Sequence, residues 1–443
     1  MKTNVKTVSH EVTHEGGKAS IQKPLQELER AVATCLLWEN TFYEKGDDIA
    51  ARIADLVKSN KAEDVAALAV RARTDLKLRH IPLWLVLQLI RHHRHAHSAL
   101  IVKTIVEVLK RPDEMTELLS LYWKEGRKPL AACLKRGLAM VFPVFSAYQL
   151  AKWNKNSAVK LRDVLFLCHA KPKDEAQDLM WKSLIDGTLP SPDTWEVALS
   201  RGAEKKVTWE RLLTEKKLGD MALLMNVRNM VAAGVSLALI EVALREQAGK
   251  SKALPLRYIA AAQAAPQLAS ALSDAMLLAV EGQLGGSTVL LVDVSASMGG
   301  ELSAKSSLTR LDAASALAIL LREVCPSVRI FTFSNDVAEV PNYRGLPLGT
   351  AIAQSQDHRG TYLHQALNRL RTHGGPPDER MILVTDEQSH DGIIPAWMPK
   401  SYLINVAPYK PGLDTYNGWT RINGWSERIV DWMRYEEVDK VNT

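Results

Sequence analysis

The sequence predicts a multidomain protein in which an all-α region is followed by an α/β domain with a doubly wound sheet. Between residues 22 and 283, apolar residues recur at three- and four-residue spacing, which is the period of helices that bury one face. After the segment GQLGGS (residues 282–287), nearly continuous apolar strands alternate with amphipathic helices, as a parallel sheet covered on both faces requires. A chain of 443 residues is also too long for one ordinary core.

The all-α region, residues 22–283, is expected to consist of short to medium helices joined by brief turns. Its clearest periodic segments are LQELERAVATCLLWE, EDVAALAVRART, LWLVLQLIRHH, SALIVKTIVEVLK and DMALLMNVRNMVAAG. The expected breaks between helices fall at Pro82, Pro112, Pro129, Pro143, Pro172, Pro190 and Pro192. This pattern predicts stacked helical pairs, an arrangement that resembles a HEAT-like solenoid.

The second domain is expected at residues 285–435, between the helical region and a short tail at 436–443. Strands are predicted at TVLLVDVS (288–295), VRIFTFSN (328–335), RMILVTDE (380–387) and YLINVAPY (402–409). Helices are predicted at LTRLDAASALAILLREV (308–324) and TYLHQALNRLRTHGG (361–375). Residues 1–21 are polar and are expected to form a flexible leader.

Composition excludes several classes of protein. The chain has 47% hydrophobic and 24% charged residues, so it can bury a sizeable core and is not globally disordered. The polar start carries no apolar core of a signal peptide, and no apolar run reaches about 20 residues, so a cytoplasmic protein without a membrane partner is expected. The four cysteines contain no C-x-x-C pair and are expected to be reduced and buried. The net charge of +6 is compatible with a nucleic-acid partner but does not require one.

Oxygen-bearing side chains follow several of the predicted strands. Ligands of doubly wound sheets bind beyond the carboxyl ends of the strands, and Asp293 leaves the first strand at that edge. Alternation turns Ser295 and Ser297 the same way. Two further loops at the edge bring Thr361 (HRGTYLH) and Asp386 (ILVTDEQ). Two carboxylates with hydroxyls and waters suit Mg²⁺, which prefers octahedral oxygen coordination.

The order D-x-S-x-S, then Thr, then Asp resembles the metal-ion-dependent adhesion site of von Willebrand factor A domains. The resemblance implies that the five residues carry a divalent cation, some of them through water, with one position open to an acidic ligand from a partner. The plain alternative is a polar turn with an N-cap serine. No base paired with an activated nucleophile lies nearby in the sequence, so recognition rather than catalysis is expected.

A basic segment, KWNKNSAVKLRDVLFLCHAKPK (residues 152–173), stands out in the helical region. Its six basic residues face a single acid, Asp163; they are Lys152, Lys155, Lys160, Arg162, Lys171 and Lys173. Such a density of charge can hold phosphates, and Trp153 and His169 can add stacking or base-edge contacts to single-stranded RNA. The plain alternative is a solvated helix face.

The segments LRDVLFLCHAKP, TWERLL and ALLMNVRNM, in a helical array that precedes an A domain, resemble the TROVE module of Ro ribonucleoproteins, and LLVDVSASM resembles the corresponding Ro segment. The resemblance spans nearly the whole chain. It implies a noncatalytic, monomeric ring of helical repeats that is closed by the A domain. It further implies that small Y-like noncoding RNAs bind the basic outer surface and that single-stranded 3′ ends of misfolded RNA bind the central hole.

The same resemblance places the outer-surface RNA contacts on Lys152 and His169, and charge alone adds Lys155 and Arg162. A helix-capping histidine is the alternative for His169. Asn156 stands where animal members are expected to carry a basic residue, which weakens the expectation of Y RNA binding. An exoribonuclease partner and a role in RNA quality control or stress response follow from the resemblance. The competing hypothesis is a protein-interaction scaffold that acts through the metal of the A domain.

Three other sequence patterns are weaker evidence of a functional site. HEVTH (residues 10–14) matches the H-E-x-x-H zinc pattern but lies in the polar leader, so catalytic zinc is not expected. RHHRHAHS (residues 91–98) is expected to be a basic helix C-terminus, although metal or RNA binding stays open. Three tryptophans near the end are expected to pack a last helix against the sheet; they are Trp419, Trp425 and Trp432.

Overall fold

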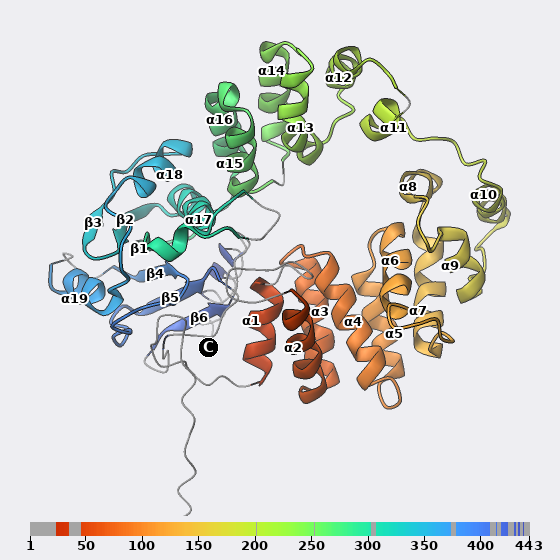
Figure 1. Cartoon of the computed structure of the whole chain (residues 1–443), viewed down its shortest axis with the longest axis horizontal. Coiled ribbons are helices and arrows are strands. Elements are labelled where there is room, and N and C mark those ends of the chain that lie inside the picture. Colours follow the sequence, from red (N-terminus) through yellow and green to blue (C-terminus); the bar gives the residue numbers. More distant parts are fainter. Residues whose placement is uncertain are drawn as a thin grey trace, which may run out of the picture. The chain divides into compact units, whose positions relative to one another are not determined.

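The computed structural model describes residues 24–34, 46–200, 202–251, 253–302, 307–373 and 378–407, together with 413, 418–423, 429–430, 433–434 and 437. Along these residues a long series of helices precedes a six-stranded, mostly parallel sheet with helices, which confirms the predicted fold class (Figure 1). The HEVTH segment, Cys35, Trp425 and Trp432 lie outside the described residues. Within the described ranges, no helix is both long and apolar enough to cross a bilayer.

The helices of the first part run from Pro24 to Ala279. They are α1 (Pro24–Thr34), α2 (Gly46–Ser59), α3 (Ala62–Thr74), α4 (His80–His92), α5 (Ser98–Val108), α6 (Pro112–Tyr122), α7 (Ala132–Val141), η1 (Phe142–Val144), α8 (Ala147–Trp153), α9 (Leu161–Cys168), α10 (Glu175–Asp186), α11 (Trp195–Ser200), α12 (Lys205–Thr214), α13 (Asp220–Ala232), α14 (Leu237–Ala248), α15 (Pro255–Ala264), η2 (Pro266–Leu268) and α16 (Ala269–Ala279).

The α/β part begins at Ser287. Its elements are β1 (Ser287–Asp293), η3 (Ala296–Gly299), α17 (Arg310–Val324), β2 (Ser327–Phe333), β3 (Val337–Glu339), α18 (Leu346–Ala353), α19 (Leu363–His373), β4 (Arg380–Thr385), β5 (Lys400–Asn405) and β6 (Thr420–Asn423).

Helices pack mainly on the next helix and on the one after it. Contacts join α3 to α4 and α5, α5 to α7, and α7 to α9, and the later helices repeat the pattern from α12 to α16. This is the packing of stacked helical pairs. The centre of the early series is α4, in which every residue from Ile81 to Ile90 is buried. A helix that is apolar on all sides is stable only when it is surrounded by other helices.

One predicted helix break is wrong. Pro82 lies within α4, as its third residue, rather than in the connection before it. A proline in the first turn costs no intrahelical hydrogen bond, because the first N–H groups of a helix have no partner in the helix. Pro112, by contrast, begins α6, and Pro172 lies between α9 and α10, as expected.

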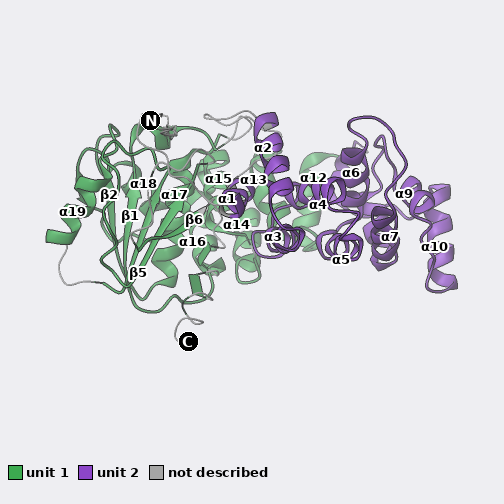
Figure 2. Cartoon of the chain, turned by 90° about the horizontal axis from the view of Figure 1, so that it is seen from below, with its two compact units in different colours: residues 1–22, 38–46, 204–443 green, residues 23–37, 47–203 purple. Residues whose placement is uncertain are grey.

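The chain divides into two compact units (Figure 2). One unit comprises residues 23–37 and 47–203, and residues 204–443 lie in the other. Helices α12–α16 therefore cluster with the sheet, and α15 packs directly on α17. The change from helices to strands falls between Ala279, where α16 ends, and Ser287, where β1 begins.

The sheet has the strand order β3-β2-β1-β4-β5-β6, and each neighbouring pair is parallel except β2 with β3. One face is covered by α19, whose Leu363 and Leu367 pack in a core with Leu291 and Leu383 of the strands. Helix α17 packs on β1 and β2, and Figure 1 shows it across the sheet from α19. Because β1, β2 and β4 run in parallel, the loops that follow them emerge at one edge of the sheet.

The predicted role of Trp419 needs a correction. Trp419 does not belong to a last helix; it precedes β6 and is buried in the core beneath α19. Its indole N–H donates to the carbonyl oxygen of Ile394 at 2.8 Å. Three cysteines, Cys133, Cys168 and Cys325, are buried free thiols, as predicted.

Candidate functional site

The first loop at the sheet edge brings a carboxylate and two hydroxyls together. Asp293 ends β1 and is fully buried, and Ser295 is the N-cap residue of the short helix η3. The backbone N–H of Ser295 donates to Oδ1 of Asp293 at 2.9 Å. The hydroxyl oxygens of Ser295 and Ser297 lie 3.2 Å apart. The alternation inferred from the sequence thus places these three side chains in one small space.

Hydrogen bonds fasten the other two loops to the first. The N–H of Ala296 donates to the carbonyl oxygen of Arg359 at 3.0 Å, which joins the first loop to the segment that leads to Thr361. The hydroxyl of Thr385, the last residue of β4, donates to Oδ2 of Asp293 at 2.6 Å. Asp386 follows directly and is fully buried. The three loops therefore hold one another at the edge of the sheet.

Thr361 is held through the backbone of its loop. Its side chain is almost completely buried, and its carbonyl oxygen accepts the N–H of His390 at 2.9 Å. The imidazole of His390 stacks on Tyr362, with the ring centroids 5.3 Å apart. Ser334, which follows β2, also supports this loop, because its hydroxyl accepts the N–H of Arg359 at 2.9 Å and donates to the carbonyl oxygen of Gly360 at 3.1 Å.

We call Asp293, Ser295, Ser297, Thr361 and Asp386 the oxygen cluster. Burial, and then the negative charge of Asp386, raise the pKa of Asp293 to about 7, against the hydrogen bonds from Ser295 and Thr385 that lower it. Two buried acids that repel each other in this way are stabilised by a proton or by a cation. The donor set consists of carboxylate and hydroxyl oxygens, which is the chemistry that a hard divalent cation such as Mg²⁺ accepts.

Sequence reasoning missed Arg310, the first residue of α17. Its side chain is only 3% exposed, and Nη1 lies 3.1 Å from Oδ2 of Asp386. The same nitrogen donates to the carbonyl oxygen of Ser297 at 2.8 Å. No group of three or more His, Cys, Asp or Glu side chains placed to hold a metal occurs among the described residues. The oxygen cluster contains only two acids, so any cation there depends on the hydroxyls.

The basic segment of the helical region forms a second candidate site, built around Trp153 at the end of α8. The guanidinium of Arg111 lies over the indole ring, 3.5 Å from its centroid. The ammonium groups of Lys152 and Lys155 lie 5.6 and 5.3 Å from the same ring, and Lys152 is also 6.0 Å from the ring of Tyr148. We call Arg111, Tyr148, Lys152, Trp153 and Lys155 the α8 surface.

Arg111 is fixed before any ligand arrives. It immediately precedes α6, which packs on both α8 and α9. Its Nε and Nη2 donate to the two carboxylate oxygens of Asp113 at 3.0 and 2.8 Å, a paired geometry that restricts the guanidinium. Arg79 donates to the same carboxylate at 2.7 Å. Arg111 lies 42 positions from Trp153 in the sequence, so nothing in the basic segment itself pointed to it.

His169 and Arg162 both lie on the exposed surface of α9 and its end. His169 is the C-cap of α9 and adopts the left-handed conformation, with φ 55° and ψ 41°. The capping position is the alternative foreseen from the sequence, and it leaves the residue exposed. Phe166, one turn before the cap, is 58% exposed, which is unusual for a phenylalanine and adds an apolar ring to this part of the surface.

The histidines of residues 91–98 lie at and just after a helix C-terminus, as expected from the sequence. Helix α4 ends at His92, and His93 caps it, with Nε2 3.1 Å from the carbonyl oxygen of Val57. His97 precedes α5 and lies 3.2 Å from a carboxylate oxygen of Glu63. His93 and His97 therefore join the turn between α4 and α5 to α2 and α3.

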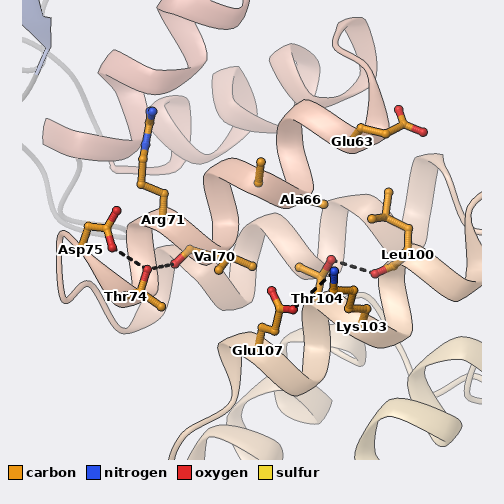
Figure 3. A pocket seen from close by; sticks show the side chains of 11 residues that line it. Glu63, Ala66, Val70, Arg71, Thr74, Asp75, Leu100, Lys103, Thr104 and Glu107 are labelled. Carbon is orange, nitrogen blue, oxygen red and sulfur yellow. Dashed lines mark hydrogen bonds and ion pairs between the residues drawn. The ribbon is translucent and has the colours of Figure 1, made fainter. Parts of the chain in front are cut away.

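A pocket of about 440 Å³ lies between α3 and α5 (Figure 3). Its lining includes Ala66, Val70 and Leu100, together with Lys103 and Glu107, which pair at 3.8 Å. The hydroxyls of the two threonines that line it donate to carbonyl oxygens of their own helices. The lining includes no residue of the oxygen cluster or of the α8 surface.

Comparisons with known proteins agree with this architecture. Residues 178–297 match the TROVE domain, a segment that runs from α10 to Ser297 of the oxygen cluster. The crystal structure of the Ro (RSR) protein of Deinococcus radiodurans superposes with a TM-score of 0.61 and 17% sequence identity, over 94% of this chain and 100% of that chain. No curated protein sequence matches the chain. Residues 178–297 are therefore similar to the TROVE domain, and the chain has the fold of a Ro protein.

Proposed function

We propose that the chain is a noncatalytic RNA-binding protein that holds RNA on the α8 surface and on the adjoining end of α9. One observation carries the proposal: three cationic side chains, Arg111, Lys152 and Lys155, surround one partly exposed aromatic residue, Trp153. Cationic groups bind phosphates, and aromatic rings stack on unpaired bases. A surface that combines both is suited to the loops and single-stranded parts of a small structured RNA.

The components of the α8 surface differ in how they would act. Arg111 is held by Asp113 and serves as a fixed phosphate ligand. Lys152 and Lys155 have flexible stems, so their ammonium groups follow the backbone of the RNA. His169 offers ring nitrogens to a base edge or a phosphate from the exposed end of α9.

The TROVE match and the Ro fold support a more specific proposal. The ligand of the outer surface is a small Y-like noncoding RNA, and a second class of ligand comprises the single-stranded 3′ ends of misfolded RNA. In that case the chain acts in RNA quality control or in a stress response, with an exoribonuclease as partner. This role in RNA quality control or stress response does not require an enzymatic activity of the chain.

The test is an electrophoretic mobility shift with a small structured RNA and a 3′-tailed RNA over a salt series. The double variant Lys152→Ala/His169→Ser should lose the structured RNA and keep the tailed one. The matched control, Lys103→Ala/His95→Ser, removes the same residue types from exposed positions of the same unit and should bind as the wild type does. Equal losses in both double variants would contradict a defined RNA surface.

The oxygen cluster supports a second proposal, namely that the α/β part binds Mg²⁺. Asp293, Ser295, Ser297 and Asp386 would hold the ion, with Thr361 reached directly or through water. A bound divalent ion would offer one coordination position to a carboxylate of a protein partner. Calorimetric titration with Mg²⁺ should show one site that Asp293→Ala abolishes, while Asp274→Ala, a variant at an exposed acid of α16 outside the cluster, retains it.

A further inference from the structure

Arg310 lies inside the oxygen cluster rather than beside it. Its Nη1 lies 3.1 Å from Asp386 and 2.8 Å from the carbonyl oxygen of Ser297, so a single guanidinium bridges the loop after β4 and the loop after β1. The side chain is 3% exposed and that of Asp386 is 0% exposed. An arginine buried beside a carboxylate in this way adds a fixed positive charge where a divalent cation is proposed to bind.

The fold holds Arg310 in this place. Thr309 caps α17, with its hydroxyl accepting the N–H of Asp312 at 3.0 Å, and the N–H of Arg310 donates to the carbonyl oxygen of Gly300 at 3.0 Å. A β-carbon at Gly300 would approach the guanidinium to 3.3 Å, so the glycine leaves room for the arginine. Backbone and side chain of Arg310 are thus both tied to the first loop.

Charge counting shows what the arginine changes. The two acids of the cluster contribute two negative charges and Arg310 contributes one positive charge. Glu387, the neighbouring buried acid, is paired with Arg421 at 3.0 Å. With a divalent cation bound, the cluster would carry one net positive charge; without Arg310, the same loaded cluster would be neutral.

We propose that the fixed positive charge of Arg310 weakens divalent-cation binding at the oxygen cluster. The same charge makes the cation-loaded cluster positive overall, so that the loaded cluster selects an anionic ligand. This inference rests on the proposed metal site. The repulsion between the guanidinium and the ion lowers the affinity for the ion. The surplus positive charge then favours a carboxylate or another anion at the open coordination position.

The test is calorimetric titration of the full chain with Mg²⁺, in the wild type and in Arg310→Gln, Arg310→Lys and Asp293→Ala. Arg310→Gln should bind Mg²⁺ at least about tenfold more tightly, because the variant removes the repulsion between the guanidinium and the ion. For a unit charge and a divalent ion about 6 Å apart, this repulsion corresponds to about tenfold in affinity even in a medium as polar as water. Arg310→Lys keeps the charge and should stay close to the wild type.

Each result decides the question. Equal or weaker binding by Arg310→Gln would overturn the role of Arg310 while leaving the metal site in place. No binding by the wild type and by Arg310→Gln alike would overturn the metal site itself. A second measurement needs no variant: wild-type affinity for Mg²⁺ should rise when sodium acetate replaces sodium chloride at equal ionic strength, and an unchanged affinity would contradict a cationic loaded cluster. Circular dichroism in chelator checks that the variants fold.

Discussion

Glu114 offers a sharp test of how the helical part supports the α8 surface. It is the third residue of α6, and its side chain is completely buried. Oε1 lies 2.6 Å from Nη2 of Arg73 on α3, and Oε2 accepts the backbone N–H groups of Lys110 and Arg111 at 2.8 and 3.0 Å. One carboxylate therefore joins α3 to the start of α6, from which Arg111 reaches Trp153.

The perturbation is Glu114→Gln, which keeps the shape and removes the charge. Arg73 is 13% exposed, so the variant leaves a nearly buried guanidinium without its charged partner. Breaking a buried ion pair from one side costs about 3 to 5 kcal/mol. The glutamine oxygen can accept the two backbone N–H groups only when its NH2 faces the guanidinium of Arg73, donor against donor, so we expect a cost of about 3 kcal/mol or more.

Hydrogen exchange followed by mass spectrometry measures this locally, which suits a chain of two compact units. A loss of about 3 kcal/mol lowers the protection of amides in α3 and α6 about a hundredfold. The control is Glu117→Gln, one turn later on α6, whose side chain is 25% exposed and pairs with Arg79 at 3.3 Å. That variant should lose less than about 1 kcal/mol. Equal changes in the two variants would refute the argument from burial.

Three further predictions concern other parts of the chain. Gly345→Ala should lower the thermal midpoint by the equivalent of about 2 kcal/mol or more. Gly345 has φ 63° and ψ −148°, and a β-carbon there would collide with a serine hydroxyl of α16. The control Gly349→Ala, inside α18, should leave the thermal midpoint near that of the wild type, because the nearest atom to its β-carbon would be 3.6 Å away. When a chelator removes divalent ions, the folded chain keeps the proton of Asp293 up to about pH 7, whereas the unfolded chain loses it near the ordinary pKa of 3.8. The free energy of unfolding should therefore fall as the pH rises between these two values. Asp293→Asn should therefore exceed the wild type in thermal midpoint at pH 8 and lose most of that advantage by about pH 4; a constant gap would contradict the raised pKa. Lys155→Gln should reduce the slope of log affinity for RNA against log salt by about 0.7 to 0.9, and an unchanged slope would mean that Lys155 contacts no phosphate.

Periodicity was enough to predict the fold class and the strands of the sheet centre, because each central strand is buried on both faces and reads as a continuous apolar run. The edge strands β3 and β6, with three and four residues, are too short to leave such a signal. Helix α18 was missed as well, because LPLGTAIA carries a proline and a glycine and resembles a loop.

The candidate site was predictable where its residues follow strands, and not where they come from elsewhere. The alternation in DVSAS and the parallel strands place Asp293 and Asp386 at one edge from sequence alone. In the sequence, Arg310 has no feature that distinguishes it from other residues in the first turn of a helix. The packing of α17 in the structure brings its guanidinium to Asp386. Arg111 is hidden in the same way, because its contact with Trp153 depends on the packing of α6 against α8.

The position of β1 and β4 in the sheet has a consequence for how the oxygen cluster behaves over time. Both strands have hydrogen-bonded neighbours on each side, so the backbone that carries Asp293, and the backbone that leads directly into Asp386, cannot fray as an edge strand does. The short outer strands open first and leave the inner ladder intact. Exchange of a ligand at the proposed metal site would therefore require movement of the loops at residues 359–361 and 386–391 over a stationary base, and not unfolding of the sheet.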